Sequence, residues 1–446
     1  MIGRLPGWDR RFRVTAVSEF RAAGPVVRLL VLTQLAFNVG FFMVLPYLAV
    51  HLSDDLAQGS AVIGAVLGLR TVSQQGLFIV GGILSDRIGV RPVVLLGCAC
   101  RVLGFLGLGL STGLAGIAVG AVLTGFAGAL FSPAVEAALA RAVAPATTST
   151  DLDRAGARGD SARSARLGAF ALFTAFGQLG TFLGPLVGAA LLLVDFTAAC
   201  LVAAALFAVI GCAQLRWLPG EPGDCSRGGA GSVPGWRVAL ANRPFLAFAA
   251  VMSVQLVGYN QLYLLLPLQV DRAWGSAAPL SVLFAAASLL VVFGQLPVTA
   301  VVAGLRPVTC LAVGLASMAA AFAVGAAGAA ANLRGVAALT VLVGFILLFT
   351  VGQMIATPTA RAMIPSLAGD RWLGTYYGLF ASIGGLAVLP AATATGLLSD
   401  LLPTTGIGAA GPWLLMSGAF ALATVPTLRG ASPTTRMRAA EGMASR

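Results

Sequence analysis

Arg70 is a charged residue inside the otherwise apolar run 60–83. It lies twelve residues before Gly82, which is about 18 Å along a helix. An arginine near the centre of a bilayer costs on the order of 3 kcal/mol unless it faces water or a partner. Gln74 follows one turn later on the same helix face. The pair indicates either a polar cavity, where Arg70 contacts a solute or its counter-charge, or a structural arginine satisfied by glutamines and backbone carbonyls.

Polar side chains also recur inside two other apolar runs. Gln34 and Asn38 lie one helical turn apart in the first run, and Gln255, Tyr259 and Tyr263 share one face of the seventh. Interfacial tyrosines would give a similar composition, but Tyr259 is too deep in its run for that position. Amide, hydroxyl and aromatic groups of this kind suit an aromatic or amphiphilic solute. We expect these residues to line the same cavity as Arg70 and Gln74.

The composition requires helices embedded in lipid to position these side chains. The chain has 446 residues, of which 58% are hydrophobic and 10% are charged, whereas a soluble protein carries about 25% charged residues. A soluble protein with so few charged residues could not cover its surface, so a soluble protein is excluded. The net charge of +12 therefore does not indicate nucleic-acid binding. The single histidine, His51, excludes a multi-histidine metal site, and the six cysteines do not have the spacing of metal ligands. We therefore expect no metal and no cofactor.

Apolar runs long enough to cross about 30 Å of hydrocarbon need about 20 residues each. The sequence contains twelve such runs, and we predict an all-α membrane protein with twelve transmembrane helices. The predicted spans are 27–50, 60–83, 92–112, 114–139, 166–193, 196–217, 244–268, 278–303, 307–330, 335–357, 373–398 and 410–428.

Arginine placement predicts the orientation, because cytoplasmic loops carry the excess of positive charge. With both termini in the cytoplasm, the outer loops hold five aspartates (Asp54, Asp55, Asp195, Asp271 and Asp400) and two arginines (Arg272 and Arg334). The inner loops and ends then hold Arg4, Arg10, Arg11, Arg13, Arg21, Arg28, Arg87, Arg91, Arg154, Arg158, Arg163, Arg429, Arg436 and Arg438. We predict a multi-pass protein of a bacterial cell membrane with both termini cytoplasmic.

The two halves of the chain repeat each other. Gln34, Asn38 and Pro46 match Gln255, Tyr259 and Pro267 at a constant offset of 221 positions. The turns 89–93 and 304–308 both have the form Gly-x-Arg-Pro-Val, and Ser132-Pro133 matches Thr357-Pro358. Parallel six-helix repeats with a solute site at the midplane are the architecture of the major facilitator fold. The predicted organisation is a basic N-terminus 1–26, a bundle 27–218, a cytoplasmic linker 219–243, a second bundle 244–428 and a cytoplasmic tail 429–446.

The loop after the second span resembles the signature loop of the major facilitator superfamily. It contains Gly82, Asp86, Arg87, Gly89 and Arg91, and it departs from the signature at Val90, where a basic residue is usual. Glycine permits the tight turn, and the arginines hold the loop in the cytoplasm. The resemblance implies that Asp86 latches the cytoplasmic side by pairing with neighbouring helix ends.

Glu136, on the fourth span, is placed to join the same charge network. The alternative interpretation is a topology-setting turn without a role in gating. The second-half copy of the loop has Val301 and Val302 at the positions of Asp86 and Arg87. Any latch is therefore expected on one half only.

The fifth span contains Gly180, Gly184, Pro185 and Gly188, and resembles the antiporter motif G-x-x-x-G-P-x-x-G-G with alanine at the last position. In the superfamily this motif marks exporters. Glycines four residues apart also form a smooth face for close helix contact, so the alternative is a packing motif that says nothing about direction. The proline within the motif favours export.

The stretch from Gly68 through Gln74 to the signature loop, together with Gly128-Ala-Leu-Phe-Ser-Pro133, resembles the MdtH family of multidrug-resistance proteins. The resemblance covers the chain in helix order and implies the drug:proton antiporter branch of the superfamily. One departure concerns the fourth span, where Ser132 replaces the acid that this family carries beside the proline. The proton-binding acid of that family therefore cannot be assigned directly to a residue of this chain.

Proton coupling needs a carboxylate that binds and releases a proton, and no acid lies deep in the predicted membrane spans. The candidates are Asp86, Glu136 and the outer pair Asp54 and Asp55. A charged solute balanced on Arg70 and facilitated diffusion also remain open.

We predict a secondary transporter, acting as a monomer and not as an enzyme, that exports small amphiphilic organic compounds, such as antibiotics, by proton antiport and alternating access. The first alternative is an importer of a small nutrient, which would accumulate its solute rather than confer resistance. The second is a transporter-like membrane sensor. An enzyme is disfavoured because no cluster of His, Asp or Cys lies at one depth of the membrane.

Overall fold

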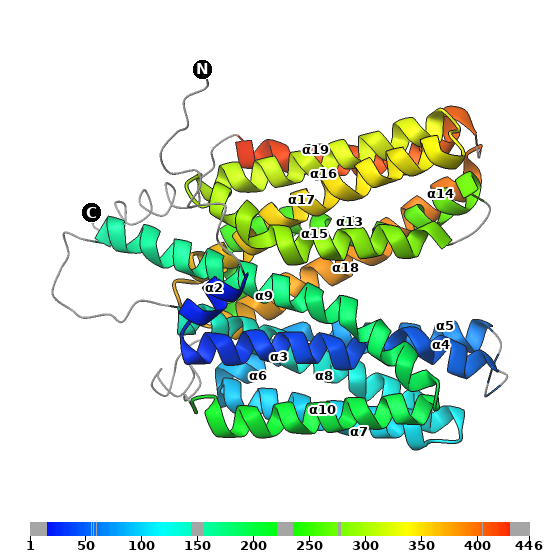
Figure 1. Ribbon diagram of the computed structural model, residues 1–446. Helices are drawn as coiled ribbons and strands as arrows, with labels where there is room; N and C mark the ends of the chain where they lie inside the picture. Colours follow the sequence, from blue (N-terminus) through cyan, green and yellow to red (C-terminus); the bar gives the residue numbers. More distant parts are fainter. Residues whose placement is uncertain are drawn as a thin grey trace. The chain divides into compact units, whose positions relative to one another are not determined.

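The computed structural model describes residues 16–54, 56, 58, 60–143, 155–220, 235–274, 278–403 and 405–428. Every regular element within these ranges is an α-helix, as predicted (Figure 1). Several predictions concern positions outside the described residues, namely those on Arg4, Arg10, Arg11, Arg13, Asp55, Arg154, Arg429, Arg436, Arg438, most of the linker and the tail.

The chain divides into two compact units. The N-terminal unit spans Ala16–Asn242 and also includes Ile364–Ser382, and the C-terminal unit contains Arg243–Met363 and the described residues from Ile383 onward. The helices up to the linker are α2 (Ala16–Ala22), α3 (Pro25–Phe42), α4 (Leu45–Asp54), α5 (Ser60–Gln75), α6 (Phe78–Ile88), α7 (Val90–Leu110), α8 (Leu114–Ala142), α9 (Ala155–Leu192), α10 (Phe196–Trp217) and α12 (Gly235–Ala241). Those that follow are α13 (Arg243–Gln261), α14 (Leu265–Trp274), α15 (Ala278–Val302), α16 (Pro307–Ala330), α17 (Gly335–Ala368), α18 (Leu373–Leu401) and α19 (Gly406–Leu428).

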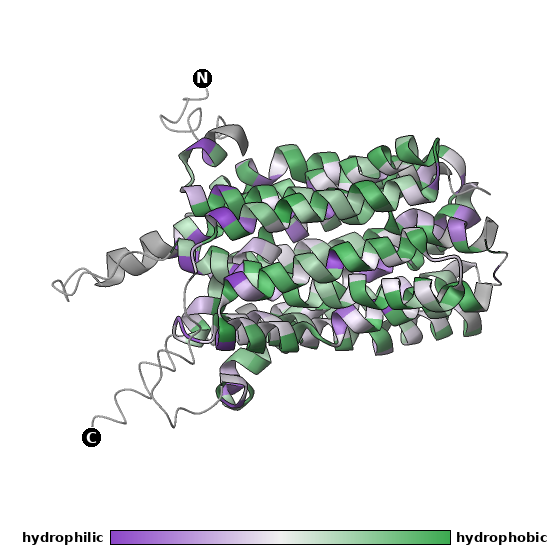
Figure 2. Cartoon of the chain, turned by 90° about the horizontal axis from the view of Figure 1, so that it is seen from below, coloured by the Kyte–Doolittle hydropathy of each residue, from purple (hydrophilic) through white to green (hydrophobic). Residues whose placement is uncertain are grey.

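Eleven helices in the described part of the chain are long and apolar enough to cross a membrane. They coincide with eleven of the twelve predicted spans. The remaining span, 60–83, is divided between α5 and α6 at Gly76 and Leu77, so that neither piece alone reaches the length of a full crossing. Apolar residues cover most of the helix length in each unit (Figure 2), as lipid-facing helices require.

The repeat between the two halves is also seen in the backbone, because the first span of each half is broken into two helices. Helix α3 ends at Phe42 and α4 begins at Leu45, whereas α13 ends at Gln261 and α14 begins at Leu265. In both cases the paired proline, Pro46 or Pro267, lies in the first turn of the second piece, where its missing N–H is tolerated. The internal repeat inferred from the sequence is therefore expressed in backbone geometry.

Helices in the N-terminal unit approach one another through small residues. Helix α8 packs against α5 and α7, and α3 packs against α9 and α10. A Cβ at Gly125 of α8 would lie only 2.3 Å from the carbonyl oxygen of Arg70, and one at Gly120 would lie 2.8 Å from that of Gly104. Close packing of backbones is the usual means of helix association in lipid, and here it holds α5 and α7 against α8.

The C-terminal unit is held by an aromatic core. Phe322 of α16 contacts the rings of Phe345 and Phe349 on α17 and of Trp413 and Phe420 on α19, with ring centroids 5.3–6.0 Å apart. Aromatic pairs at these separations stabilise beyond simple burial. In this cluster the stabilising contacts are apolar.

Candidate functional site

Arg70 and Gln74 form the polar pair predicted from their spacing. The Arg70 guanidinium donates a hydrogen bond to Oε1 of Gln74 and lies over the Phe41 ring, 4.5 Å from its centroid. The hydroxyl of Ser73 bonds to the carbonyl oxygens of Arg70 (2.7 Å) and of Val122 on α8 (3.2 Å). This segment of α5 is therefore held against α8 at the level of the arginine.

A second arginine, Arg101, lies beside this pair and was not among the residues expected at the site. Its side chain is completely buried at the middle of α7. The guanidinium carbon lies 4.3–5.9 Å from the ring centroids of Phe37, Phe41, Phe207 and Phe105. Within the described part of the chain, none of its three side-chain nitrogens has a hydrogen-bond partner. An arginine inside the span 92–112 is itself a sequence signal, of the same kind as Arg70.

The two arginines converge on the same surroundings. Phe41 lies within 4.9 Å of both guanidinium carbons. On α8, a Cβ at Gly128 would lie 3.0 Å from Nε2 of Gln74 and 3.2 Å from Nη2 of Arg101. We refer to Arg70, Gln74 and Arg101 as the arginine cluster. It brings two positive charges together in the interior of an apolar bundle.

Gln34 and Asn38 face α9. The Asn38 side chain donates a hydrogen bond of 2.8 Å to the carbonyl oxygen of Gly177, and Gln34 lies beside the same glycine. These contacts show how the two residues are held, and their place in a cavity stays a prediction.

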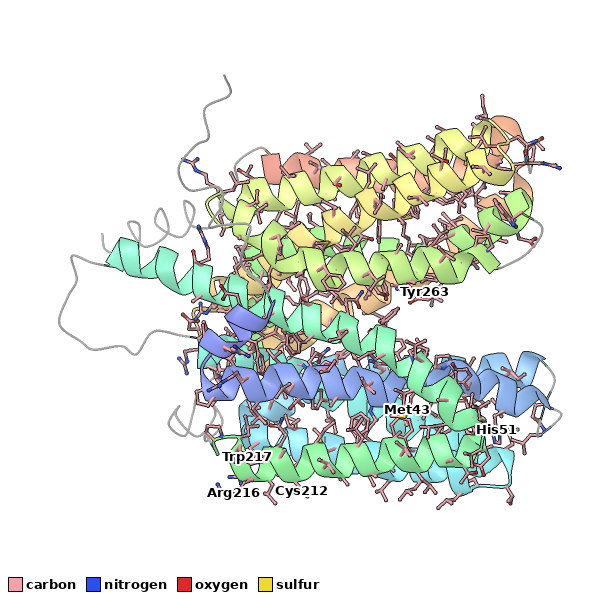
Figure 3. The ribbon with its side chains drawn as sticks, in the orientation of Figure 1. Met43, His51, Cys212, Arg216, Trp217 and Tyr263 are labelled. Carbon is pink, nitrogen blue, oxygen red and sulfur yellow. The ribbon has the colours of Figure 1, made fainter. Side chains whose placement is uncertain are left out.

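The C-terminal unit holds the other predicted cavity residues, Gln255, Tyr259 and Tyr263. Gln255 is buried, and its Nε2 is without a partner among the described residues. The hydroxyls of Tyr259 and Tyr263 are 3.2 Å apart, and the Tyr263 ring stacks on Phe284 at 5.6 Å. Tyr263 is 57% exposed (Figure 3). The three residues therefore present amide and aromatic groups at and near the end of α13.

Asp86 binds the N-terminus of a helix far along the chain. Its side chain is 1% exposed and accepts hydrogen bonds from the backbone N–H groups of Gly374 (3.0 Å) and Thr375 (2.6 Å) at the start of α18. Arg141 of α8 pairs with the same carboxylate at 3.3 Å. A carboxylate is favoured at a helix N-terminus because free N–H groups and the helix dipole both attract it. Asp86 therefore contacts the N-terminus of α18 within the N-terminal unit, and its role as a latch stays a prediction.

The glycines of this contact are sterically required. A Cβ at Gly82 would lie 2.1 Å from the carbonyl oxygen of Gly374, and one at Gly374 would lie 1.9 Å from the Ser85 hydroxyl. Gly89 has a φ of 91° between α6 and α7, which is a backbone conformation that favours glycine. The glycines of the signature loop thus permit the close approach of α6 to α18.

The other charged residues of the loop have different positions. Arg91 donates to the carbonyl oxygen of Leu215 near the end of α10, where a cation also suits the helix dipole. Arg87 is exposed. Glu136 is partly buried on α8, and its membership of the charge network stays a prediction.

The turn before α18 is anchored by contacts that the sequence did not reveal. Arg166 of α9 pairs with Asp370 at 2.6 Å, and Asn242 donates to the carbonyl oxygen of Leu367 and to the Tyr376 hydroxyl. Asp370 and Trp372 both have a φ of 56°, which is uncommon for residues other than glycine. These contacts fix the start of α18 against the N-terminal unit.

Two buried tyrosines follow in the first turn of α18. Tyr376 and Tyr377 are 2% and 1% exposed, and Tyr377 contacts the ring of Phe170 at 5.9 Å.

The antiporter-like motif of α9 packs along α3. Cβ atoms at Gly180, Gly184 and Gly188 would lie 2.5, 2.7 and 2.3 Å from atoms of α3 and the turn that follows it. Pro185 lies inside the helix, and its carbonyl oxygen accepts a 2.7 Å hydrogen bond from the Tyr47 hydroxyl. The motif therefore serves close packing, and its link to export stays a prediction.

The N-terminal unit has opposite ends marked by different residues. Figure 3 places Arg216 and Trp217 of α10 at one end and His51 of α4 towards the other. His51 stacks on Phe196, with centroids 4.2 Å apart. Among the described residues, no group of three or more His, Cys, Asp or Glu could hold a metal ion.

A bundle of helices long enough to span a membrane, in which a buried carboxylate holds a helix end 288 residues away, is the architecture of a polytopic membrane protein. The sequence profile of the Major Facilitator Superfamily matches residues 30–392. The chain belongs to this superfamily, which the signature loop had indicated.

Comparisons with known proteins give relatives along most of the chain. An uncharacterized transporter of this superfamily from Mycobacterium tuberculosis H37Rv is 37% identical over 383 residues, covering 85% of this chain and 87% of the relative. Multidrug resistance protein MdtH of Cronobacter sakazakii is 27% identical, covering 83% and 85%, and MdtH of Escherichia coli O9:H4 is 25% identical, covering 83% and 86%.

A solved structure confirms the fold. The human organic anion transporter MFSD10 (TETRAN) superimposes with a TM-score of 0.69 at 18% identity, covering 91% of this chain and all of that one.

Proposed function

We propose that this transporter exports small amphiphilic organic compounds across a bacterial cell membrane by alternating access, driven by proton antiport. The contact of Asp86 with α18 is the observation that carries the proposal. It is a buried ionic contact that joins helices from the two halves of the sequence, and it can be broken without loss of any covalent or metal link. The relatives named multidrug resistance protein support an organic solute.

Asp86 is also the strongest candidate for the proton carrier. Of the acids whose exposure the structure describes, it is the one classed as buried. Protonation would remove its negative charge, and with it the attraction for Arg141 and for the α18 N-terminus. Proton binding would therefore favour release of α18, which is the coupling that an antiporter needs. Glu136 remains the alternative carrier.

Two rival functions make different predictions. An importer would move its solute across the membrane in the same direction as the proton. The glycine–proline motif of α9 favours export instead. A sensor would bind solute without moving it. We further propose that both termini are cytoplasmic and that the monomer is sufficient for transport.

The proposal is tested by reconstituting the purified protein into liposomes with an imposed pH gradient. A panel of cationic, neutral and anionic dyes, with ethidium as the cation, is followed by fluorescence. Wild type is expected to move at least one dye against the proton flow, and to stop when a potassium–proton exchanger collapses the gradient. Asp86→Asn is expected to lower the rate at least about tenfold, whereas the exposed control Glu19→Gln is expected to match wild type.

Dye movement in the same direction as the proton would establish an importer. Binding without movement would establish a sensor. If Asp86→Asn transports dye as fast as wild type and Glu136→Gln loses transport, Glu136 is the proton carrier.

A further inference from the structure

We propose that the arginine cluster is a binding site for an organic anion, and that it takes an oxyanion group such as a carboxylate or sulfonate carried on an aromatic or apolar body. The site lies entirely within the N-terminal unit. The inference deepens the proposed function and rests on it for its role in transport, because it assigns a charge to the solute.

The unpaired charge of Arg101 is the first argument. Its side chain is 0% exposed, and its three nitrogens lack hydrogen-bond partners within the described part of the chain. No acidic side chain pairs with Arg70 or Arg101 among those residues either. A buried charge without a partner is among the most costly features of a protein interior. A site that binds an anion would explain why both charges are present.

The aromatic surroundings do not remove this need. The rings of Phe37 and Phe41 lie within 5 Å of the Arg101 guanidinium carbon and attract it by cation–π interaction. However, phenyl rings carry no lone pairs, and a guanidinium has five N–H donors to satisfy. Phe41 also lies against Arg70, so that two positive charges share one ring. A bound oxyanion would accept from these donors and reduce the repulsion between the charges.

The glycines and the exposure of α5 indicate how an anion enters. Arg70 and Gln74 are partly exposed, whereas Arg101 is completely buried. Gly128 leaves out the Cβ that would crowd both Gln74 and Arg101. An anion would therefore meet Arg70 first and reach Arg101 past Gln74, while the phenylalanine rings contact the apolar part of the solute.

The repeated half of the sequence shows that the fold does not require these arginines. Gly89 and Gly304 occupy equivalent turns and are 215 positions apart. The same offset places Ala285 opposite Arg70 and Ala316 opposite Arg101. Two alanines thus occupy the corresponding positions in the C-terminal unit, which indicates that the arginines serve binding rather than helix packing.

Equilibrium binding with a matched set of probes tests the site. The full-length protein is purified in detergent and titrated with naphthoate, naphthamide and naphthylmethylammonium, which share one aromatic body and differ in charge. Wild type is expected to bind naphthoate at least about tenfold more tightly than the other two. Arg70→Gln and Arg101→Met are each expected to weaken naphthoate binding about 10- to 100-fold, because each removes hydrogen bonds to a charged group. Naphthamide binding should change less than about threefold.

Arg216→Gln is the matched control, because Arg216 is exposed on α10 in the same unit, and it should bind all three probes as wild type does. Arg101→Lys keeps the charge and should retain the preference for naphthoate. If Arg101→Met fails to fold, Arg70→Gln and Arg101→Lys decide the question. Equal affinity of wild type for naphthoate and naphthamide, or an unchanged preference in Arg70→Gln, would overturn the proposal.

The binding and transport results separate the two proposals. Gradient-driven ethidium transport without a preference for naphthoate would overturn the anion site and leave the exporter standing. A preference for naphthoate that depends on the two arginines, with no gradient-driven transport of any dye, would leave the anion site standing and remove the exporter.

Discussion

The two units share a repeated sequence but hold their helices together by different chemistry. The N-terminal unit contains charges inside the bundle: Arg101 and Asp86 are buried, Arg70 is partly buried, and Asp86 pairs with Arg141. In the C-terminal unit, the buried polar residues in the described part are neutral, as in Gln295, which donates to Thr299 and to the Met354 carbonyl oxygen. Val301 stands where the repeat would place Asp86.

This difference separates what the helical scaffold needs from what function adds. The C-terminal unit shows that uncharged glutamines, small residues and aromatic rings suffice to pack such helices. Charges in the N-terminal unit carry a desolvation cost that packing alone does not justify. Coupling and solute recognition are therefore expected to depend on the N-terminal unit more than on its copy.

Asp86→Asn should give the largest loss of stability. The amide cannot accept from both N–H groups of α18 while facing Arg141, so a buried contact is left incomplete. We expect a loss of about 3 kcal/mol, seen as a lower unfolding temperature in detergent. Glu19→Gln, which changes an exposed acid of the same unit, should unfold as wild type does. Equal unfolding temperatures for the two variants would show that the Asp86 contact is not stabilising.

Gly188→Val should disrupt the packing of α9 on α3. A Cβ there would lie 2.3 Å from the Met43 carbonyl oxygen, so the helices must move apart, at a cost of about 2–3 kcal/mol. Gly168→Ala is the control on the same helix, because no atom lies within 4 Å of a Cβ at that position. Thermal unfolding of both variants measures the difference. A Gly188→Val protein as stable as Gly168→Ala would contradict the packing role.

Arg101→Met should stabilise the ligand-free protein. Methionine keeps the apolar contacts with the phenylalanine rings and removes a charge without hydrogen-bond partners. We expect a gain of about 2 kcal/mol, measured as a higher unfolding temperature without added anion. A lower unfolding temperature would instead identify Arg101 as a structural residue.

Gln295→Leu tests the neutral counterpart in the C-terminal unit. The change removes hydrogen bonds to Thr299 (3.1 Å) and to the Met354 carbonyl oxygen (2.8 Å), and should destabilise by about 1 kcal/mol. If Arg101→Met raises the free energy of unfolding and Gln295→Leu lowers it in the same experiment, the contrast between the two units is sharpened. If both variants change the free energy of unfolding in the same direction, the contrast is lost.

Tyr263→Phe should have the smallest effect. It removes the contact between the Tyr259 and Tyr263 hydroxyls but keeps the stacking on Phe284, so stability should change by less than about 0.5 kcal/mol because the side chain is largely exposed. Dye transport should stay within about twofold of wild type. A large loss of transport with normal stability would assign the hydroxyl to solute binding.

Most of the fold could be predicted from the sequence, because length and hydropathy define membrane helices and the repeated prolines relate the two halves. The break of the second span at Gly76 and Leu77 was not foreseen. Arg101 satisfies the criterion that identifies Arg70, and was accessible from sequence on that ground. Its aromatic partners were not, because Phe37 and Phe207 converge on it only through the packing of α3 and α10.

The donors to Asp86 were equally inaccessible to sequence reasoning. A carboxylate near a helix end predicts some helix terminus as partner, but backbone N–H groups have no residue signature. Gly374 and Thr375 are donors because they lie at the start of α18, directly after the turn at Asp370 and Trp372, and meet Asp86 in the folded chain. Contacts of this kind come from tertiary geometry.

The sequence distance between Asp86 and its donors has a consequence for biosynthesis. The 288 residues that separate Asp86 from Gly374 take about 15–60 s to synthesise at typical elongation rates. Throughout that interval the Asp86 carboxylate lacks the two backbone N–H donors at the start of α18. The contact between Asp86 and the start of α18 can therefore form only after α18 has been synthesised.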